Sequence, residues 1–237
     1  MKFRLIIKGI IAFFPSFLKR PLYRHLFGYQ IGNRVRIGLS VIDVENCTIG
    51  DDVAIGHFNM FIGTKTVSIG NNTHIRHLNI FQNGDLISIG RYCAILRLNE
   101  VNSLKAADMI NAVDQTLIIG DGTMIGTWHK IDFSDRVEFG KCVILGGRNS
   151  SVWTHNRQMT QPVKIGDHSY IGSEIRIAPG GEIPANCIVG IGSVITTKLT
   201  GEYNLIAGVP AKVLKELSTA DKFLIENKTR PDLPDDI

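Results

Sequence analysis

Aliphatic residues recur at every sixth position between residues 165 and 195. Each block of six opens on a β-branched residue, and the openers are Ile165, Ile171, Ile177, Ile183, Val189 and Ile195. Side chains of a strand alternate with a period of two, so a block can bury its first and fifth residues together only if the chain turns between them. Each block is therefore predicted to form a short strand and a corner. Three blocks would close one triangular coil, and stacked coils would bury the openers as columns.

Residue types inside the blocks fit this assignment. Gly and Asp at the second and third places, as in Gly166 and Asp167, adopt the backbone conformations of corners. The fifth places carry small or medium residues, as an inward position near a corner requires: Ser169, Ile175, Gly181, Cys187 and Ser193. The pattern is thus an internal repeat, which predicts a solenoid.

The same register begins at Ile31 and continues with longer steps. Openers follow at Ile49, Ile69, Ile89, Ile119, Phe139 and Ile165. Because three blocks make about 18 residues, the steps of about 20 predict a coil with two extra residues at a corner. Two larger steps predict excursions within residues 97–116 and 146–164. In the first, apolar residues at Val101, Ala107 and Val113 leave open whether it loops out or continues the wall.

This repeat resembles that of the hexapeptide-repeat acyltransferases. The resemblance implies an all-β fold, a left-handed parallel β-helix; the spacing itself shows no hand, and the general preference for right-handed crossovers would argue the other way. We expect residues 1–30 to form a basic, apolar helical segment, residues 31–216 the β-helix acyltransferase domain, and residues 217–237 a C-terminal helix and acidic tail. Ser218 is the predicted N-cap of that helix, over 218–228, with Asp221 three residues on.

Positive charge is concentrated at the N-terminal end. Eight basic residues and no acidic residue precede Asp43, whereas the rest of the chain holds 18 basic and 22 acidic residues. This distribution favours an anionic surface at that end rather than nucleic acid along the body. The apolar run from Leu5 to Phe14 contains Lys8, ends at Pro15 and is shorter than the roughly 20 residues of a membrane span. We expect helices that lie on a membrane surface, cap the open end of the solenoid, or do both.

The four cysteines form no CxxC pair and are widely spaced: Cys47, Cys93, Cys142 and Cys187. Cys93 and Cys187 fall at fifth places, where a small inward residue is expected, so a structural role is favoured over a disulfide or zinc site. A reducing cytoplasm fits this interpretation, with peripheral contact at the cytoplasmic face of the membrane if the N-terminal segment binds lipid.

His155 is the predicted catalytic base. Acyl transfer from a thioester needs a base for the attacking hydroxyl or amine and donors for the developing oxyanion, and histidine is the natural base near neutral pH. In similar hexapeptide acetyltransferases the catalytic histidine occupies a loop before the final coils, and His155 lies in such a loop, between Trp153 and Asn156. His129 is the second candidate base, or a residue of the acceptor site with Trp153 and Asn156.

A zinc site is not expected. The related γ-carbonic anhydrases bind zinc through three histidines, but His57, His74 and His77 do not have the interval of that family.

The segment 188–214 is similar to the C-terminal signature that binds coenzyme A in acetyl-CoA-dependent members of the family. The resemblance implies that Gly172 and Ser173 face the thioester, with the Ser173 N–H as oxyanion donor. It also implies that Ile191 and Gly192 line the pantetheine groove, that Thr196 lies near the adenine, and that Lys212 meets the phosphates. The family often has lysine directly after that threonine; here Thr197 occupies the place and Lys198 follows.

These observations predict an acetyl-CoA-dependent O-acetyltransferase, without metal, that modifies a sugar hydroxyl of a surface polysaccharide or lipopolysaccharide precursor. A homotrimer is expected, because active sites of similar enzymes form between neighbouring solenoids. Two alternatives stay open at this stage: N-acetylation of an amino-sugar nucleotide, and a non-catalytic hexapeptide-repeat scaffold.

Overall fold

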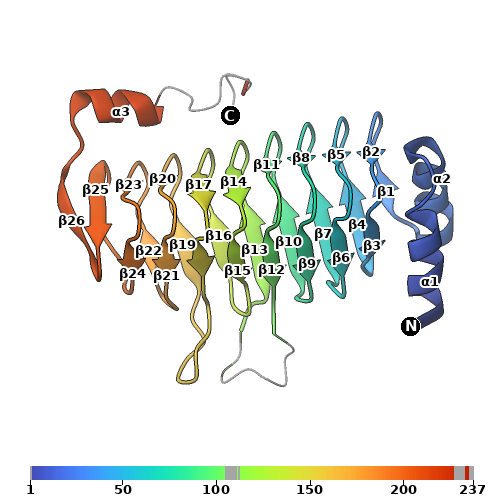
Figure 1. Cartoon of the computed structure of the whole chain (residues 1–237), viewed down its shortest axis with the longest axis horizontal. Coiled ribbons are helices and arrows are strands. Elements are labelled where there is room, and N and C mark those ends of the chain that lie inside the picture. The colour runs from blue at the N-terminus through green and yellow to red at the C-terminus, as the bar shows by residue number, and fades with distance from the viewer. Residues whose placement is uncertain (1, 105–110, 112, 227–232, 235–237) are drawn as a thin grey trace.

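The computed structural model describes residues 2–104, 111, 113–226 and 233–234, and of residues 2–4 only the backbone. The chain forms a left-handed parallel β-helix, with helices at both ends of the stack of coils (Figure 1). Each coil contributes one strand to each of three parallel sheets, as the six-residue register predicts.

The first sheet is eight-stranded in the described part of the chain, and each strand pairs in parallel with the strand one coil away. Its strands are β1 (Gln30–Ile31), β4 (Asn46–Ile49), β7 (Thr66–Ile69), β10 (Leu86–Ile89), β13 (Thr116–Ile119), β16 (Val137–Phe139), β19 (Val163–Ile165) and β22 (Glu182–Ile183).

The second sheet ends in an antiparallel hairpin, β25–β26. Its strands are β2 (Arg36–Ile37), β5 (Ala54–Ile55), β8 (His74–Ile75), β11 (Ala94–Ile95), β14 (Met124–Thr127), β17 (Ile144–Arg148), β20 (Tyr170–Ile171), β23 (Ile188–Val189), β25 (Asn204–Gly208) and β26 (Ala211–Glu216).

The third sheet lies beside the excursions of the chain. Its strands are β3 (Val41–Asp43), β6 (Met60–Ile62), β9 (Ile80–Gln82), β12 (Glu100–Asn102), β15 (Lys130–Asp132), β18 (Ser151–Val152), β21 (Arg176–Ile177) and β24 (Val194–Ile195). We call the turns from the first to the second sheet the first corner, those from the second to the third the second corner, and those from the third back to the first the third corner.

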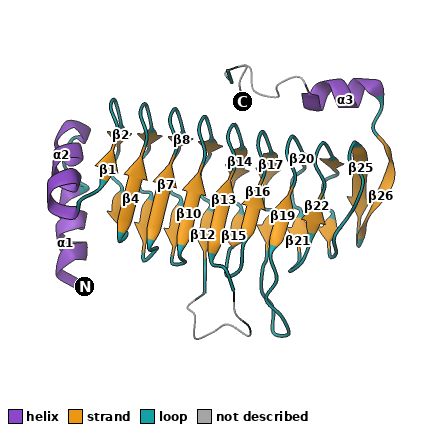
Figure 2. Cartoon of the chain, turned by 180° about the vertical axis from the view of Figure 1, so that it is seen from behind, coloured by secondary structure: helices purple, strands orange, loops and turns teal. Residues whose placement is uncertain are grey.

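The block openers form the core. Each opener between Ile165 and Ile195 is at most 2% exposed, and the fifth-place residues among them are buried as well. The two extra residues of the 20-residue coils lie at the third corner, because Phe61 of the third sheet is eight residues from Ile69 of the first. Both long excursions also leave at the third corner (Figure 2). Val101 continues the wall in β12, whereas Ala107 lies outside the described residues.

Two helices cover the N-terminal end of the solenoid, α1 (Lys2–Ile11) and α2 (Ser16–Phe27) (Figure 1). Lys8 of α1 is 1% exposed, and its Nζ lies 2.8 Å from Asp43 Oδ1 and 2.7 Å from the Tyr29 hydroxyl. Lys19 of α2 is equally buried and donates to the Ile37 carbonyl; burial lowers the pKa of its ammonium group to about 8. The helices therefore serve as the predicted cap. None of the helices among the described residues is long and apolar enough to cross a membrane.

The C-terminal helix α3 (Thr219–Glu226) begins as expected. Ser218 Oγ accepts from the Asp221 N–H at 3.2 Å, and Asp221 Oδ2 accepts from the Ser218 N–H at 3.3 Å. This reciprocal pair is a capping box, which satisfies two backbone donors at the helix start.

Candidate active site

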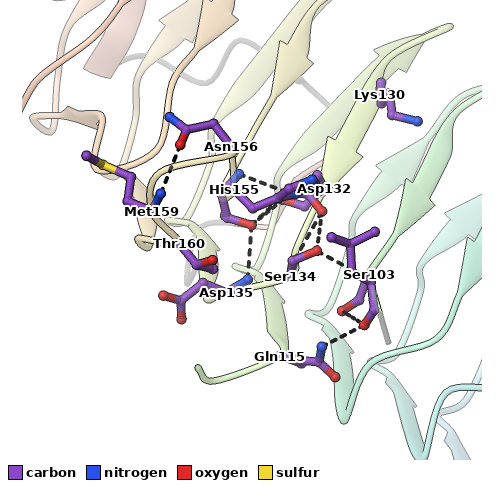
Figure 3. Close-up of polar contacts among 12 residues, drawn as sticks. Ser103, Gln115, Lys130, Asp132, Ser134, Asp135, His155, Asn156, Met159 and Thr160 are labelled. Atoms are coloured by element: carbon purple, nitrogen blue, oxygen red, sulfur yellow. Dashed lines mark hydrogen bonds and ion pairs between the residues drawn. The ribbon is translucent and has the colours of Figure 1, made fainter. Parts of the chain in front are cut away.

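His155 is paired with a buried carboxylate. Asp132 ends β15 and is 0% exposed, and its Oδ2 lies 2.7 Å from His155 Nδ1 (Figure 3). An ionised carboxylate can only accept hydrogen bonds, so Nδ1 carries the ring proton and Nε2 keeps its lone pair. The His155 side chain is 27% exposed. The pair thus presents an oriented imidazole whose Nε2 lone pair can accept a proton.

The rest of the chain holds the Asp132 carboxylate in place. Thr154 donates to Oδ2 through its backbone N–H at 2.9 Å and through its hydroxyl at 2.8 Å. Ser134 donates to Oδ1 through its hydroxyl at 2.5 Å and its N–H at 3.3 Å. Four donors besides the imidazole offset the loss of water around this buried charge. These donors also hold the carboxylate in one orientation, and the carboxylate in turn fixes the orientation of the imidazole.

The loop that carries His155 is a small hairpin. His155 and Thr160 form an antiparallel bridge, and Asn156 Oδ1 accepts from the N–H groups of Gln158 and Met159 at 2.7 and 2.9 Å. The side-chain oxygen of Asn156 is therefore used within the loop, where it stabilises the turn. Asn111 joins the other excursion to this hairpin, since its amide donates to the Thr160 carbonyl and accepts from the Thr160 N–H.

Trp153 lies beside the Asp132–His155 pair. Its ring is edge-on to His155, with centroids 6.2 Å apart and an interplanar angle of 72°. Lys130 Nζ lies 5.5 Å from the centre of the Trp153 ring and 2.5 Å from Glu100 Oε1. Lys130 also lines a cavity of about 430 Å³ on the third sheet, with Trp128, which is 62% exposed. An aromatic and charged surface therefore extends from His155 along this sheet.

His129 lines the same cavity but is 1% exposed. It belongs to a column of polar side chains at the second corner, in which each residue accepts from the backbone of the next coil. Asn99 Oδ1 accepts from the His129 N–H at 2.8 Å, and His129 Nδ1 accepts from the Ser150 N–H at 3.0 Å. Burial lowers the pKa of His129 to about 4. Its ring is a neutral part of the column at neutral pH.

Four of the residues predicted to contact the cofactor lie together at the second corner: Gly172, Ser173, Ile191 and Gly192. The Gly192 N–H donates to the Ser173 carbonyl at 3.0 Å, which joins the two coils. Ile191 is 73% exposed. These residues form a ledge with an apolar side chain and exposed backbone.

The Ser173 N–H differs from the N–H groups of several residues at the same place in the repeat. At the third place of some blocks, the N–H donates to a side chain of the next coil: the Leu39 N–H to His57 Nδ1 at 3.1 Å, and the Lys141 N–H to Asp167 Oδ1 at 2.8 Å. The corresponding residue above Ser173 is Ile191, which has no acceptor. Within the described part of the chain the Ser173 N–H donates no hydrogen bond.

The remaining predicted cofactor residues lie elsewhere. Thr196 and Lys198 are exposed and follow β24 at the third corner, and Lys198 Nζ forms an ion pair with Glu182 at 2.7 Å. Lys212 is exposed in β26, where it pairs with Ala207 of β25.

His155 and Ser173 lie at different corners on neighbouring coils, His155 after the end of β18 and Ser173 before the start of β21. Val152 of β18 pairs with Ile177 of β21; His155 follows Val152 by three residues and Ser173 precedes Ile177 by four. At about 3.3 Å per strand residue, the two are roughly 20 Å apart within one chain. One solenoid therefore does not bring the predicted base and oxyanion donor together.

Asp132 is a candidate site residue that was not identified from the sequence. It is the one acidic residue in the run Ile131–Phe133, and apolar neighbours on both sides signal a strand that is buried there. A carboxylate in such a run requires a partner. That signal could have identified Asp132, although not its contact with His155.

No protein-family model matches the chain. Sixty-one residues, 26% of the chain, are 38% identical to the galactoside O-acetyltransferase of Escherichia coli (strain K12). That match spans 30% of the relative, so it covers less than a third of its length.

Solved structures agree over a larger part of the chain. The UDP-N-acetylglucosamine acyltransferase from Campylobacter jejuni is 18% identical with a TM-score of 0.50, over 80% of this chain and 71% of the other. The polySia-specific acetyltransferase NeuO is 19% identical with a TM-score of 0.50, over 79% and 81% of the two chains. The chain resembles the hexapeptide-repeat acyltransferases in fold and in part of its sequence. The likeness to these solved structures confirms the predicted fold.

Proposed function

We propose that the protein is an acetyl-CoA-dependent O-acetyltransferase that modifies a sugar hydroxyl of a surface polysaccharide or lipopolysaccharide precursor. The observation that carries the proposal is the Asp132–His155 pair, in which a buried carboxylate with hydrogen bonds to both oxygens orients an accessible imidazole. The likeness to a galactoside O-acetyltransferase supports a sugar as acceptor.

In this reaction His155 Nε2 accepts the proton of the attacking hydroxyl. The oxygen of that hydroxyl forms a bond to the thioester carbonyl carbon, and negative charge develops on the carbonyl oxygen. Collapse of the tetrahedral intermediate breaks the carbon–sulfur bond, and the departing thiolate takes the proton from the imidazolium. Asp132 stabilises that imidazolium through the Nδ1 proton, in the manner of the carboxylate of a catalytic triad.

The Ser173 N–H is the proposed oxyanion donor. It already points to no protein acceptor within the described residues, so it needs no rearrangement to bind the oxyanion. Because Ser173 is roughly 20 Å from His155 in the same chain, we propose that His155 of one copy faces Ser173 of a neighbouring copy. A homotrimer with one such site at each contact fits this requirement.

The cofactor is proposed to lie on the ledge at the second corner, with pantetheine against Ile191 and Gly192 and the thioester at Gly172 and Ser173. Thr196, Lys198 and Lys212 are proposed for the nucleotide end, where Lys198 must exchange its ion pair with Glu182 for a phosphate. The acceptor sugar is proposed to stack on Trp153, with Asn156 shaping the loop above it and His129 supporting the cavity on the third sheet.

Release of free thiol from acetyl-CoA tests the proposal. Purified protein is assayed with sugar, amino-sugar-nucleotide and extracted-glycan acceptors, beside the His155→Ala and His168→Ala variants. His168 is the control, because it is half-buried at the first corner, between β19 and β20. We expect release that depends on a hydroxyl acceptor, falls about a hundredfold or more in His155→Ala and persists in His168→Ala. Transfer only to amines would replace the O-acetyltransferase by an N-acetyltransferase. Acetyl-CoA binding without release for any acceptor would support a scaffold and contradict the proposal.

We also propose that the N-terminal helices contact an anionic membrane surface. Several apolar side chains of α1, α2 and the turn between them are exposed: Ile6 59%, Ile10 57%, Phe13 80%, Phe17 71% and Leu26 56%. Arg20 and Arg24 belong to the same helices, and no acidic residue precedes Asp43. Apolar side chains flanked by cations fit an interface with anionic lipid, where each cation contributes about 1 kcal/mol.

Co-sedimentation with vesicles tests this contact. Wild-type protein should sediment with phosphatidylglycerol vesicles, and a Phe13→Ser/Phe17→Ser variant should remain in the supernatant, because both rings are exposed and their loss leaves the buried cap intact. Equal sedimentation of the two proteins would contradict a role for these helices at the membrane.

A further inference from the structure

A recess near the N-terminal end of the solenoid is lined by basic side chains. Its volume is about 400 Å³, and its polar lining consists of Ser16, Arg36, His57, His74, Arg76 and His77. The described residues that line it include no carboxylate. It lies on the second sheet and second corner, several coils from His155, so the proposed transfer reaction does not use it.

The repeat itself creates the recess. In the second sheet Arg36 pairs with Ala54, and Ala54 pairs with His74. Adjacent strands are about 4.8 Å apart, so Arg36 and His74 flank Ala54 at about 10 Å from each other. Gly56, next to the strand that Ala54 begins, adds no side chain either. A floor of Ala54 and Gly56 thus lies between walls of cationic and imidazole side chains.

Two histidines present donors at the edge of this floor. His57 Nδ1 accepts from the Leu39 N–H at 3.1 Å, and His77 Nδ1 accepts from the His57 N–H at 2.9 Å. A nitrogen that accepts an N–H bond carries no proton, so each neutral ring bears its proton on Nε2. The rings are stacked, with centroids 5.6 Å apart and an interplanar angle of 6°. The backbone therefore fixes two parallel Nε2–H donors on neighbouring coils.

This arrangement suits an oxyanion better than a metal ion. A metal would require the lone pairs of several converging ligands, and no group of three or more His, Cys, Asp or Glu in the described part of the chain could hold one. An oxyanion instead requires N–H donors and positive charge, which Arg36, Arg76 and the two imidazoles supply. Ser16 is the first residue of α2 and lines the recess, so the N-terminal end of this helix lies there. The backbone dipole at a helix N-terminus favours negative charge.

We propose that this recess binds a phosphoryl group. The arginines are exposed, so their guanidinium groups can close over the floor and bind the phosphoryl oxygens in pairs. The group comes either from an anionic lipid headgroup, since α2 joins the recess to the exposed apolar side chains of the N-terminal helices, or from a soluble phosphate compound. The site does not depend on the transferase activity.

Other corners of the repeat show which substitution of His77 should retain the fold. At the first corner, Asp51 and Asp121 accept the same kind of N–H bond that His77 accepts at the second. His77→Asp therefore keeps the acceptor for the His57 N–H, removes the Nε2–H donor and adds negative charge. Arg36→Ala/Arg76→Ala removes the guanidinium groups. Arg97→Ala is the matched control, because Arg97 is exposed at the place of His77 one coil further on and does not line the recess.

Titration calorimetry with pyrophosphate and co-sedimentation with phosphatidylglycerol or phosphatidylcholine vesicles test the proposal on the full chain. We expect His77→Asp and the double arginine variant to weaken binding at least tenfold, and Arg97→Ala to bind like wild type. Loss with pyrophosphate identifies a site for soluble phosphate compounds; loss only with phosphatidylglycerol vesicles identifies a headgroup site. If neither ligand distinguishes wild type from the two variants, the recess is not a phosphoryl site and the proposal is wrong.

Discussion

Asp132 and His155 are 23 residues apart in the chain, and their side chains meet at 2.7 Å. The contact arises because the two residues lie on neighbouring coils of the solenoid. Lys130 of β15 pairs with Ser151 of β18, and both strands end at the same corner. Buried donors on both carboxylate oxygens hold Asp132, so the pair behaves as one unit. Its chemistry can therefore be tested on either residue.

Asp132→Asn should reduce kcat by about 10²- to 10⁴-fold with little change in KM. The amide cannot accept from His155 Nδ1–H in the same way when its NH₂ group occupies the place of Oδ2, so the imidazole loses its tautomer and its stabilisation as imidazolium. Asp135→Asn is the matched control, because Asp135 is buried nearby and accepts from the Asp114 and Arg136 N–H groups without touching His155. Steady-state kinetics of both variants check this. If the Asp132→Asn enzyme were as active as Asp135→Asn, the Asp132 carboxylate would have no role in the mechanism.

Ser173→Pro should lose catalysis while Ser173→Ala retains it. If the backbone N–H binds the oxyanion, removing the hydroxyl changes little, whereas removing the N–H costs about 10²- to 10³-fold in kcat. Proline is compatible with this position, because Pro179 occupies the third place of the next block and the following residue has positive φ in both blocks.

Thermal melts of the two Ser173 variants provide the control for folding. Similar melting temperatures with divergent kcat values would support the N–H as donor. Equal activity of the proline and alanine variants would mean that a group other than the Ser173 N–H binds the oxyanion.

His129→Asn should leave the fold and the reaction largely intact and should change how stability depends on pH. The folded-state pKa of His129 is about 4 and its ordinary value is 6.5, so the unfolded chain takes up a proton between these values while the folded chain does not. The wild-type free energy of unfolding should therefore fall as the pH drops from about 6.5 to 4, by up to about 3 kcal/mol from this residue.

Asparagine is the natural replacement, because Asn59, Asn79 and Asn99 occupy the same column and accept from the next coil through their side-chain oxygens. Urea denaturation at pH 7.5 and 5 should give a smaller loss of stability for His129→Asn than for wild type. The same loss in both proteins would mean that other groups cause the acid sensitivity.

The fold could be predicted in detail because its determinants are local. Each opener, such as Ile171, is both a sequence position and a core position, and the corner conformations depend on residues within the same block. The capping box of Ser218 and Asp221 is local as well. The antiparallel pairing of β26 with β25 was not predicted, since it depends on the end of the repeat rather than on its period.

The site was only half predictable because its contacts cross coils. His155 could be identified from its place in an irregular loop, but Asp132 becomes its neighbour only through the register of β15 with β18, and steps of irregular length between coils obscure that register in the sequence. His129 shows the converse. As a histidine near an excursion it resembles a site residue, whereas the column of hydrogen bonds that buries it appears only when the coils are stacked. The distance between His155 and Ser173 likewise follows from their places at different corners, His155 after β18 and Ser173 before β21.

That distance leads to a prediction about two copies of the chain. If each active site combines His155 of one copy with Ser173 of another, the inactive variants His155→Ala and Ser173→Pro should complement each other when coexpressed. In a random assembly of equal amounts, about a quarter of the sites combine an intact His155 from one copy with an intact Ser173 from its neighbour. The mixture should therefore recover about a quarter of wild-type activity, while each variant alone stays inactive. Mixing His155→Ala with Asp132→Asn is the control: both changes affect the same half of the site, and no activity should return. If the first mixture also stays inactive although the chains coassemble, both residues act within one copy or Ser173 is not the donor, and the site between copies must be abandoned.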